Sequence, residues 1–284
     1  MIRYLNFLVV LSFVFLLGPT SLLAQHRDVE QFKERYHTPS GKVFHVKVDI
    51  DAAEVKIAKC PQEDEAWLTV YYTEDEFKVH EDFDEERSRL EIEFDKKGWM
   101  DSDNDGLEAS FELKLPYGVD IDLAANIKAG EVEIDLGGLA MVDFDLKTWA
   151  GEVRVEFSEP NKTEMEYLDI NTKVGETELI KLGNARFKDA EINGGIGEMT
   201  IDFTGELLPE ARASVDLDIG ETNIILPEDV GVRLSVSKFL FMSEVNLPYR
   251  FKKSGRHYYS KNYDEAASKF ALKVSPGLGE LKID

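Results

Sequence analysis

Apolar and polar positions alternate along most of this chain, and one short phrase recurs within the alternation. The phrase is an aliphatic residue, Gly-Glu, and then two mostly apolar positions separated by one residue. It occurs at residues 129–134, 150–155, 174–179, 196–201, 219–224 and 278–283. The first five glutamates of the phrase lie 21, 24, 22 and 23 residues apart. A fixed period of this length indicates stacked structural repeats.

Each repeat contains two alternating stretches, and equivalent apolar positions can be matched from one repeat to the next. One matched set is Phe144, Leu168, Ala190 and Ala213, and another is Ile134, Val155, Leu179 and Ile201. Side chains at alternate strand positions face the same side, so these sets predict columns that fill one narrow core. The pattern predicts an all-β, single-stranded β-solenoid (β-helix-like), with two-strand rungs of about 22 residues and capped ends.

The flanking sequence predicts further strands and two caps. Residues 46–57 read as a degenerate first copy of the repeat, and strands are expected at 67–72, 90–94 and 109–115 and in a closing pair at 270–283. Val29, Phe32 and Tyr36 have helical spacing, so residues 26–37 are predicted to form a capping helix, and residues 249–268 a second cap. The expected division is a signal peptide (1–24), an N-terminal cap and β-strand region (25–118), and β-solenoid repeats with a C-terminal cap (119–284).

The first 24 residues have the order of a secretory signal. Arg3 is followed by an apolar run from Leu5 to Leu17, a Gly18-Pro19 break and a cleavage point after Ala24. An uncleaved membrane anchor is the alternative, although the apolar run is short for a spanning helix. We therefore expect export to the periplasm, the cell surface or the medium.

Composition narrows the classes of partner. The formal net charge is −23, and it becomes −24 without Arg3. Such a charge repels nucleic acid and anionic headgroups and favours cationic partners. Cys60 is the one cysteine, so no internal disulfide can form.

The order of alternating strands, then Leu113-Lys114-Leu115-Pro116-Tyr117-Gly118-Val119, then Gly-Glu repeats resembles a known family. It is similar to the bacterial toast-rack or "putative-adhesin" domains, related to the C-terminal domain of Lia-type envelope-stress regulators. The resemblance covers about residues 40–284. It implies a β-helix-like fold, an envelope location and no catalytic residues. The basic stretch 249–263 departs from the family pattern.

One motif has the spacing of a calcium loop. Asp101, Asp103 and Asp105 precede Gly106, and Glu112 stands at the twelfth position. These four carboxylates could form an oxygen cage, and calcium is the only cofactor that the sequence indicates. The alternative is a solvated acidic hairpin loop, because the flanking residues read as strands rather than helices.

Two charged features could bind partners. The glutamates of the first five phrases, stacked in register, would form a ladder that either extends into water or collects cations: Glu131, Glu152, Glu176, Glu198 and Glu221. The basic and aromatic stretch 249–263 could instead contact an anionic envelope polymer or the acidic faces of another copy. Its candidate binding residues are Arg250, Lys252, Lys253, Tyr258 and Tyr259. The alternative is a cap whose cations balance nearby carboxylates.

Motifs for catalysis are lacking in the sequence. The five histidines are scattered without metal-ligand spacing, and no nucleophile or phosphate-loop motif occurs. The leading hypothesis is a non-enzymatic exported envelope protein that presents an acidic β-solenoid as a binding or scaffold surface, in adhesion or in an envelope-stress response. An extracytoplasmic polysaccharide lyase or hydrolase using clustered carboxylates is one alternative, and a calcium-stabilised adhesin is another.

Overall fold

The computed structural model of the protein describes residues 29–98, 109–237 and 243–284. The predicted signal segment and Asp101, Asp103 and Asp105 of the predicted calcium loop lie outside these ranges. The described residues form 18 strands linked in one hydrogen-bonded network, with a single 3-10 turn at Leu182–Ala185 and no α-helix. The all-β prediction is confirmed.

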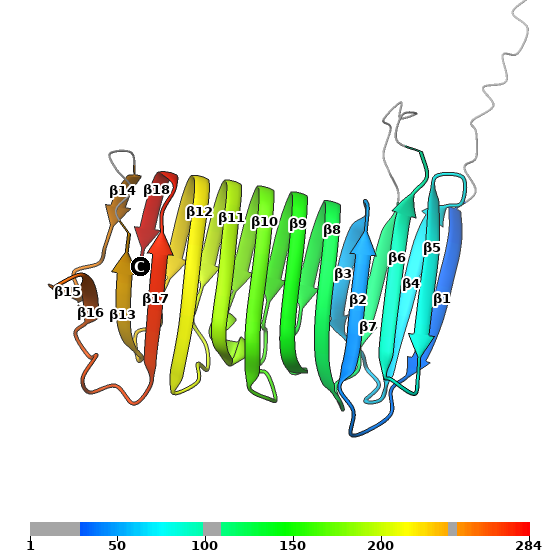
Figure 1. Cartoon of the computed structure of the whole chain (residues 1–284), viewed down its shortest axis with the longest axis horizontal. Coiled ribbons are helices and arrows are strands. Elements are labelled where there is room, and N and C mark those ends of the chain that lie inside the picture. The colour runs from blue at the N-terminus through cyan, green and yellow to red at the C-terminus, as the bar shows by residue number, and fades with distance from the viewer. Residues whose placement is uncertain (1–28, 99–108, 238–242) are drawn as a thin grey trace, which may run out of the picture.

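Five long strands carry the central repeats. They are β8 (Asp120–Asp135), β9 (Ala140–Glu156), β10 (Met165–Ile180), β11 (Phe187–Asp202) and β12 (Glu210–Ile225). Neighbouring members pair in parallel, and the phrase glycines lie directly opposite one another in the register. Each repeat is one strand that continues through its Gly-Glu corner, where the sequence pattern predicted two. Figure 1 shows the five strands side by side along the length of the molecule.

The core lies between the two stretches of each repeat strand. Ile134, Val155, Leu179 and Ile201 are partners in the register and are fully buried. In the same core, the rings of Phe187, Phe203 and Phe270 contact one another. Apolar residues thus occupy the inward positions that the alternation predicted, and burial of this surface stabilises the stack.

The N-terminal end of the stack does not follow the order of the chain. Strands β2 (Phe44–Ile50) and β3 (Glu54–Lys59) pair in parallel with β8, with Val55 opposite Val132. On their other side they pair with β6 (Arg89–Lys96) and β7 (Ser110–Leu115). The degenerate first copy therefore lies inside the stack, between segments that follow it in sequence.

The predicted helix at 26–37 is wrong. Val29–His37 forms strand β1, which pairs antiparallel with β4 (Glu65–Thr73), and β4 pairs antiparallel with β7. Phe32 and Tyr36 are four residues apart, a spacing that places both on one face of a helix or of a strand. Backbone pairing with β4 decides in favour of the strand. Strand β5 (Phe77–Asp84) closes the same end by pairing antiparallel with β6.

The C-terminal end has a similar insertion. Strands β17 (Lys269–Ser275) and β18 (Leu278–Ile283) pair in parallel with β12 on one side, and with β13 (Gly231–Val236) and β14 (Ser243–Asn246) on the other. The last strands of the chain are thus an internal layer (Figure 1).

A hairpin of β15 (Phe251–Ser254) and β16 (His257–Ser260) lies at the C-terminal end, where β16 pairs antiparallel with β13. Antiparallel strands therefore stand at both ends of the parallel stack, and such strands do not continue its hydrogen-bonding pattern. Within the ranges that the structure describes, no helix has the length and apolar character needed to cross a bilayer.

Candidate functional site

The Gly-Glu corners are stacked so closely that only glycine fits. Gly175 and Gly197 have φ angles of +133° and +143°. A Cβ added to Gly197 would lie 1.9 Å from the carbonyl oxygen of Gly175. Both the φ angle and the lack of space require glycine here. The side chains that flank these glycines are consequently aligned from each repeat strand to the next.

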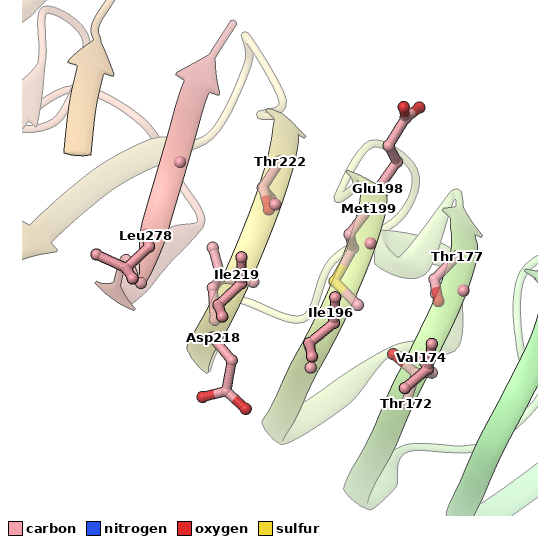
Figure 2. Close-up of a pocket in the computed structure, with 18 of the residues that line it drawn as sticks. Thr172, Val174, Thr177, Ile196, Glu198, Met199, Asp218, Ile219, Thr222 and Leu278 are labelled. Carbon is pink, nitrogen blue, oxygen red and sulfur yellow. The ribbon is translucent and has the colours of Figure 1, made fainter. Parts of the chain in front are cut away.

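An apolar row, exposed at three positions and partly buried at the fourth, Leu278, precedes these glycines, and we call it the corner ridge. It consists of Val174, Ile196, Ile219 and Leu278, each the partner of the next in the parallel register. Val174, Ile196 and Ile219 are 53%, 53% and 48% exposed. Figure 2 shows the four side chains in a row across neighbouring strands. Single exposed aliphatic residues are common, but aliphatic residues exposed in one row make this surface a candidate contact site.

The glutamates that follow the glycines form a second row beside the ridge. Glu176, Glu198 and Glu221 are register partners and all are exposed. None of them pairs with a cation among the residues that the structure describes. Neighbouring strands are about 4.8 Å apart, so these like charges repel one another. The ridge therefore has a border of uncompensated negative charge.

The space beneath this corner is too small for a ligand. It measures about 30 Å³ and lies between inward side chains that include Thr172, Thr177, Met199 and Thr222. A volume of this size corresponds to one water molecule. Only the outer surface of this corner is therefore large enough for a binding partner.

A larger hollow of about 500 Å³ lies on the outward face formed by the first halves of the repeat strands. We call it the acidic hollow. Tyr167, which is 65% exposed, is one of the residues that line it. The charged residues that line it are Asp122, Asp143, Asp145, Asp169, Asp189, Glu191 and Arg212.

Two of these carboxylates have a raised pKa because they are partly buried and close to other carboxylates. Partial burial and the nearby charges of Asp122 and Glu166 raise the pKa of Asp143. Partial burial, Asp145 and Glu191 raise the pKa of Asp169 in the same way. The hollow is therefore suited to cations and hydrogen-bond donors. In the described ranges, however, no group of three or more His, Cys, Asp or Glu side chains is arranged to hold a metal ion.

The predicted calcium ligands are only partly placed. Asp101, Asp103 and Asp105 lie outside the described residues. Glu112 lies in β7, and its carboxylate is 3.0 Å from the Lys114 ammonium. Calcium binding by these four residues stays a prediction.

The residues of the predicted basic surface make different contacts and do not all face solvent. Arg250 donates hydrogen bonds to the carbonyl oxygens of Leu226 and Asp284, so it anchors the hairpin to the end of the chain. Lys253 covers the partly buried ring of Tyr258 at 5.4 Å. Lys252 and Tyr259 are cross-strand partners in the hairpin. These last two belong to the outward face, while Arg250 and Tyr258 serve packing.

Reasoning from the sequence missed the corner ridge and Tyr167. The signal for the ridge was present, because the residue before each Gly-Glu is aliphatic at a position that alternation places outside. Its aliphatic side chains also grow along the stack, from Ala129 and Ala150 to Val174, Ile196 and Ile219. Tyr167 could have been found as an aromatic residue in an outward column of carboxylates.

Comparison with known proteins places this architecture in a family. The family model described as "N-terminal domain of toast_rack, DUF2154" matches residues 25–180, more than half of the chain. The chain belongs to the toast-rack family. A second model, "Cell wall-active antibiotics response LiaF, C-terminal", matches residues 174–283 of this toast-rack chain. The resemblance inferred from the repeats is thus confirmed.

Individual relatives are more distant. "Protein LiaF" of Bacillus subtilis (strain 168) is 31% identical over 109 residues, which are 37% of this chain and 44% of LiaF. The toast-rack chain therefore spans less than half of that relative. A "putative cell adhesion protein" from Clostridium sporogenes is 14% identical, with a TM-score of 0.44 over 89% of this chain and 99% of its own. A "putative adhesin" from Bacteroides fragilis is 12% identical, with a TM-score of 0.36 over 90% and 97%.

Proposed function

We propose that this protein is a non-enzymatic component of the bacterial envelope, exported from the cytoplasm, that binds a partner through its corner ridge. Each repeat would act as one coil of a β-solenoid scaffold. The observation that carries the proposal is the in-register exposure of Val174, Ile196 and Ile219 beside the glutamate row. The four residues of the ridge lie on neighbouring strands about 4.8 Å apart, so the ridge is about 14 Å long.

The chemistry of the ridge defines the kind of partner. An extended or helical segment with an apolar stripe would cover the aliphatic side chains and remove them from water. Lys or Arg residues beside that stripe would face Glu176, Glu198 and Glu221 and relieve their mutual repulsion. The partner is therefore an amphipathic basic segment, and the rigid glycine corners hold the surface ready for it at little conformational cost.

The family supports the envelope setting. One matching model concerns a response to cell wall-active antibiotics. A role in adhesion or in reporting envelope stress would both require an exported scaffold that contacts other envelope molecules. The predicted signal segment at residues 1–24 fits the same setting.

Binding of a synthetic peptide tests the ridge. The probe is an alternating Leu-Lys peptide, and its controls are Leu-Glu and Ser-Lys peptides of equal length. We expect the Leu-Lys peptide to bind best, because it alone supplies both an apolar stripe and positive charge. The triple variant Val174→Thr, Ile196→Thr, Ile219→Thr should bind at least about tenfold more weakly.

Matched variants separate the apolar and charged contributions. Val29→Thr changes another exposed aliphatic residue away from the ridge and should bind as the wild type does. Replacing Glu176, Glu198 and Glu221 by Gln should weaken binding mainly at low salt. Equal binding of Leu-Lys and Ser-Lys peptides, or an unchanged affinity in the ridge variant, would refute the proposal.

The acidic hollow is the observation that favours a second candidate, a polysaccharide-active enzyme. Its carboxylates include Asp143 and Asp169 with raised pKa values, and Arg212 stands beside Asp189. The assay is release of reducing or unsaturated ends from envelope polysaccharides at pH 4 to 8. We expect none. If such ends are released by the wild type and by the ridge variant, but not by Asp143→Asn or Asp169→Asn, the protein is an enzyme and the binding proposal is wrong.

A further inference from the structure

The outward face that carries the acidic hollow becomes basic at the C-terminal end of the stack. One row of register partners runs from Arg212 on β12 through Ala271 on β17 to Arg233 on β13. The row continues to Tyr259 on β16 and to Lys252 on β15. Directly opposed residues share a face of the sheet, so the outward side chains of this row lie on one surface.

The cations of this end differ from those elsewhere on the face. Near the hollow, His45, Lys147 and Arg212 each pair with an aspartate on the same face. Beyond Arg212 the exposed cations Arg233, Lys252 and Lys273 have no carboxylate partner within the described part of the chain. Unpaired cations are unexpected in a protein whose formal charge is −23. We call these three residues, with His257 and Tyr259, the basic end.

An aromatic residue, Tyr259, lies between two of these cations in the register. Tyr259 contacts His257 and Tyr263 edge to face, with ring centroids 6.2 Å and 4.9 Å apart. A hydrogen bond of 2.7 Å between the Ser235 hydroxyl and His257 Nδ1 fixes the imidazole against β13. The partly buried Tyr259 ring is therefore held in place, with Arg233 and Lys252 on either side of it in the register.

We propose that the basic end binds an anionic polymer built of sugar or polyol units that carry phosphate or carboxylate groups. Its anions would pair with Arg233, Lys252 and Lys273, and a sugar or polyol unit would pack on the ring of Tyr259. This site is separate from the corner ridge and takes a ligand of opposite charge.

Electrostatics favours a polymer over a lipid bilayer. The net negative charge of the whole protein opposes its approach to an extended anionic surface. A narrow polymer can contact the basic end alone, and the carboxylates of the acidic hollow exclude it from the rest of the face. Asp189, which holds Arg212, marks where the polymer must stop.

The test measures binding of the full-length protein to two immobilised probes, polygalacturonate and poly(glycerol phosphate), with neutral dextran as the control polymer. The variant is Arg233→Glu, Lys252→Glu, Lys273→Glu. Its matched control reverses three exposed lysines at the other end of the stack: Lys33, Lys42 and Lys78. Both variants change the net charge equally, and their folding is checked by circular dichroism and thermal melting.

We expect the wild type to bind both anionic probes and not dextran. The basic-end variant should lose at least about tenfold in affinity while the control loses much less, because close ion pairs act over short range. Tyr259→Ala should weaken binding to polygalacturonate without changing net charge. Equal losses in the two triple variants, no binding to either probe, or binding only to phosphatidylglycerol vesicles would overturn the proposal.

Discussion

Asp189 and Arg212, on neighbouring strands β11 and β12, form a bidentate ion pair in which both N–O distances are 2.7 Å. This pair is the border between the acidic and basic parts of one sheet face. On one side Asp143 and Asp169 line the acidic hollow together with Tyr167, and on the other Arg233 has no carboxylate partner in the described chain. Reversal of sign across one strand lets a single rigid face present two electrostatic surfaces.

The glycine corners should tolerate no side chain. Gly197→Ala would force a Cβ to within 1.9 Å of the Gly175 carbonyl oxygen at a φ of +143°. We expect the free energy of unfolding to fall by about 3 kcal/mol or more, measured by urea denaturation. The control is Gly255→Ala, where φ is +61° and no atom lies within 4 Å of the added Cβ. That variant should lose only about 1 kcal/mol from backbone strain, and similar losses at the two sites would contradict the close-stacking argument.

Removing the C-terminal strands should damage the interior of the stack. A chain ending at Ser268 lacks β17 and β18, which lie between β12 and the β13–β14 layer. Without them, β12 gains an open edge and the Gly231–Val236 amides lose their parallel partner. Hydrogen exchange should show that β13 loses protection.

Deleting Val29–His37 is the matched control for that truncation. Strand β1 pairs only with β4 in the described chain, so its removal takes one strand from an end. Protection of β8 to β12 should then persist. If β13 stays protected in the chain ending at Ser268, the inserted position of the last strands is wrong.

Two aspartates should respond to pH in opposite directions. The raised pKa of Asp169 means that folding disfavours its charged form, so this group lowers stability once the pH exceeds the unfolded value near 3.8. Asp169→Asn should therefore stabilise the protein at pH 7, by less than about 1 kcal/mol because water screens a partly exposed site. The gain should disappear as the pH falls below about 3.8.

Asp51 is the opposite case. Partial burial opposes its ionisation, but hydrogen bonds from the Lys128 ammonium and the Lys96 amide are stronger together and lower its pKa. Its contribution is present above the unfolded pKa and is lost as the pH falls through the lower folded value. Asp51→Asn should thus destabilise at pH 7. Unfolding curves from pH 3 to 7 check both variants, and responses of the same sign would contradict the assignment.

Calcium binding at the 101–112 motif should compete with an ion pair. The Glu112 carboxylate is 3.0 Å from Lys114, so it must leave this partner to become the twelfth-position ligand. Calcium should raise the melting temperature of the wild type, raise that of Lys114→Ala further, and leave Asp103→Ala unchanged. Magnesium serves as the control ion, and a calcium shift of equal size in Asp103→Ala would remove the motif as a site.

The repeat pattern predicted the core correctly because a constant spacing between repeats makes equivalent residues stack. Matching residues such as Ile134 and Val155 must align once Gly-Glu corners recur at nearly constant intervals, and the register places them opposite each other. The same reasoning missed the apolar ridge and the charge pattern of the outward positions. Periodicity separates inside from outside, but it does not say which outward neighbours find a partner of opposite charge.

Errors arose where local pattern and distant pairing compete. Phe32 and Tyr36 suit either a helix or a strand, and only the edge of β4 selects the strand. Likewise, the residues of β2 and β17 do not indicate that each strand lies between strands distant in sequence. Parallel edges of similar pattern accept any compatible strand, so topology is chosen by the whole chain.

The sequence by itself determined the all-β class, the parallel columns and the glycine corners, since alternation and the steric needs of a close turn are local properties. Tertiary structure decided the spatial order of the layers at both ends, the exposed apolar ridge and the change of sign at Asp189 and Arg212. These depend on which backbone edges meet and which charges come within a few ångströms, and such distances exist only after the chain has folded.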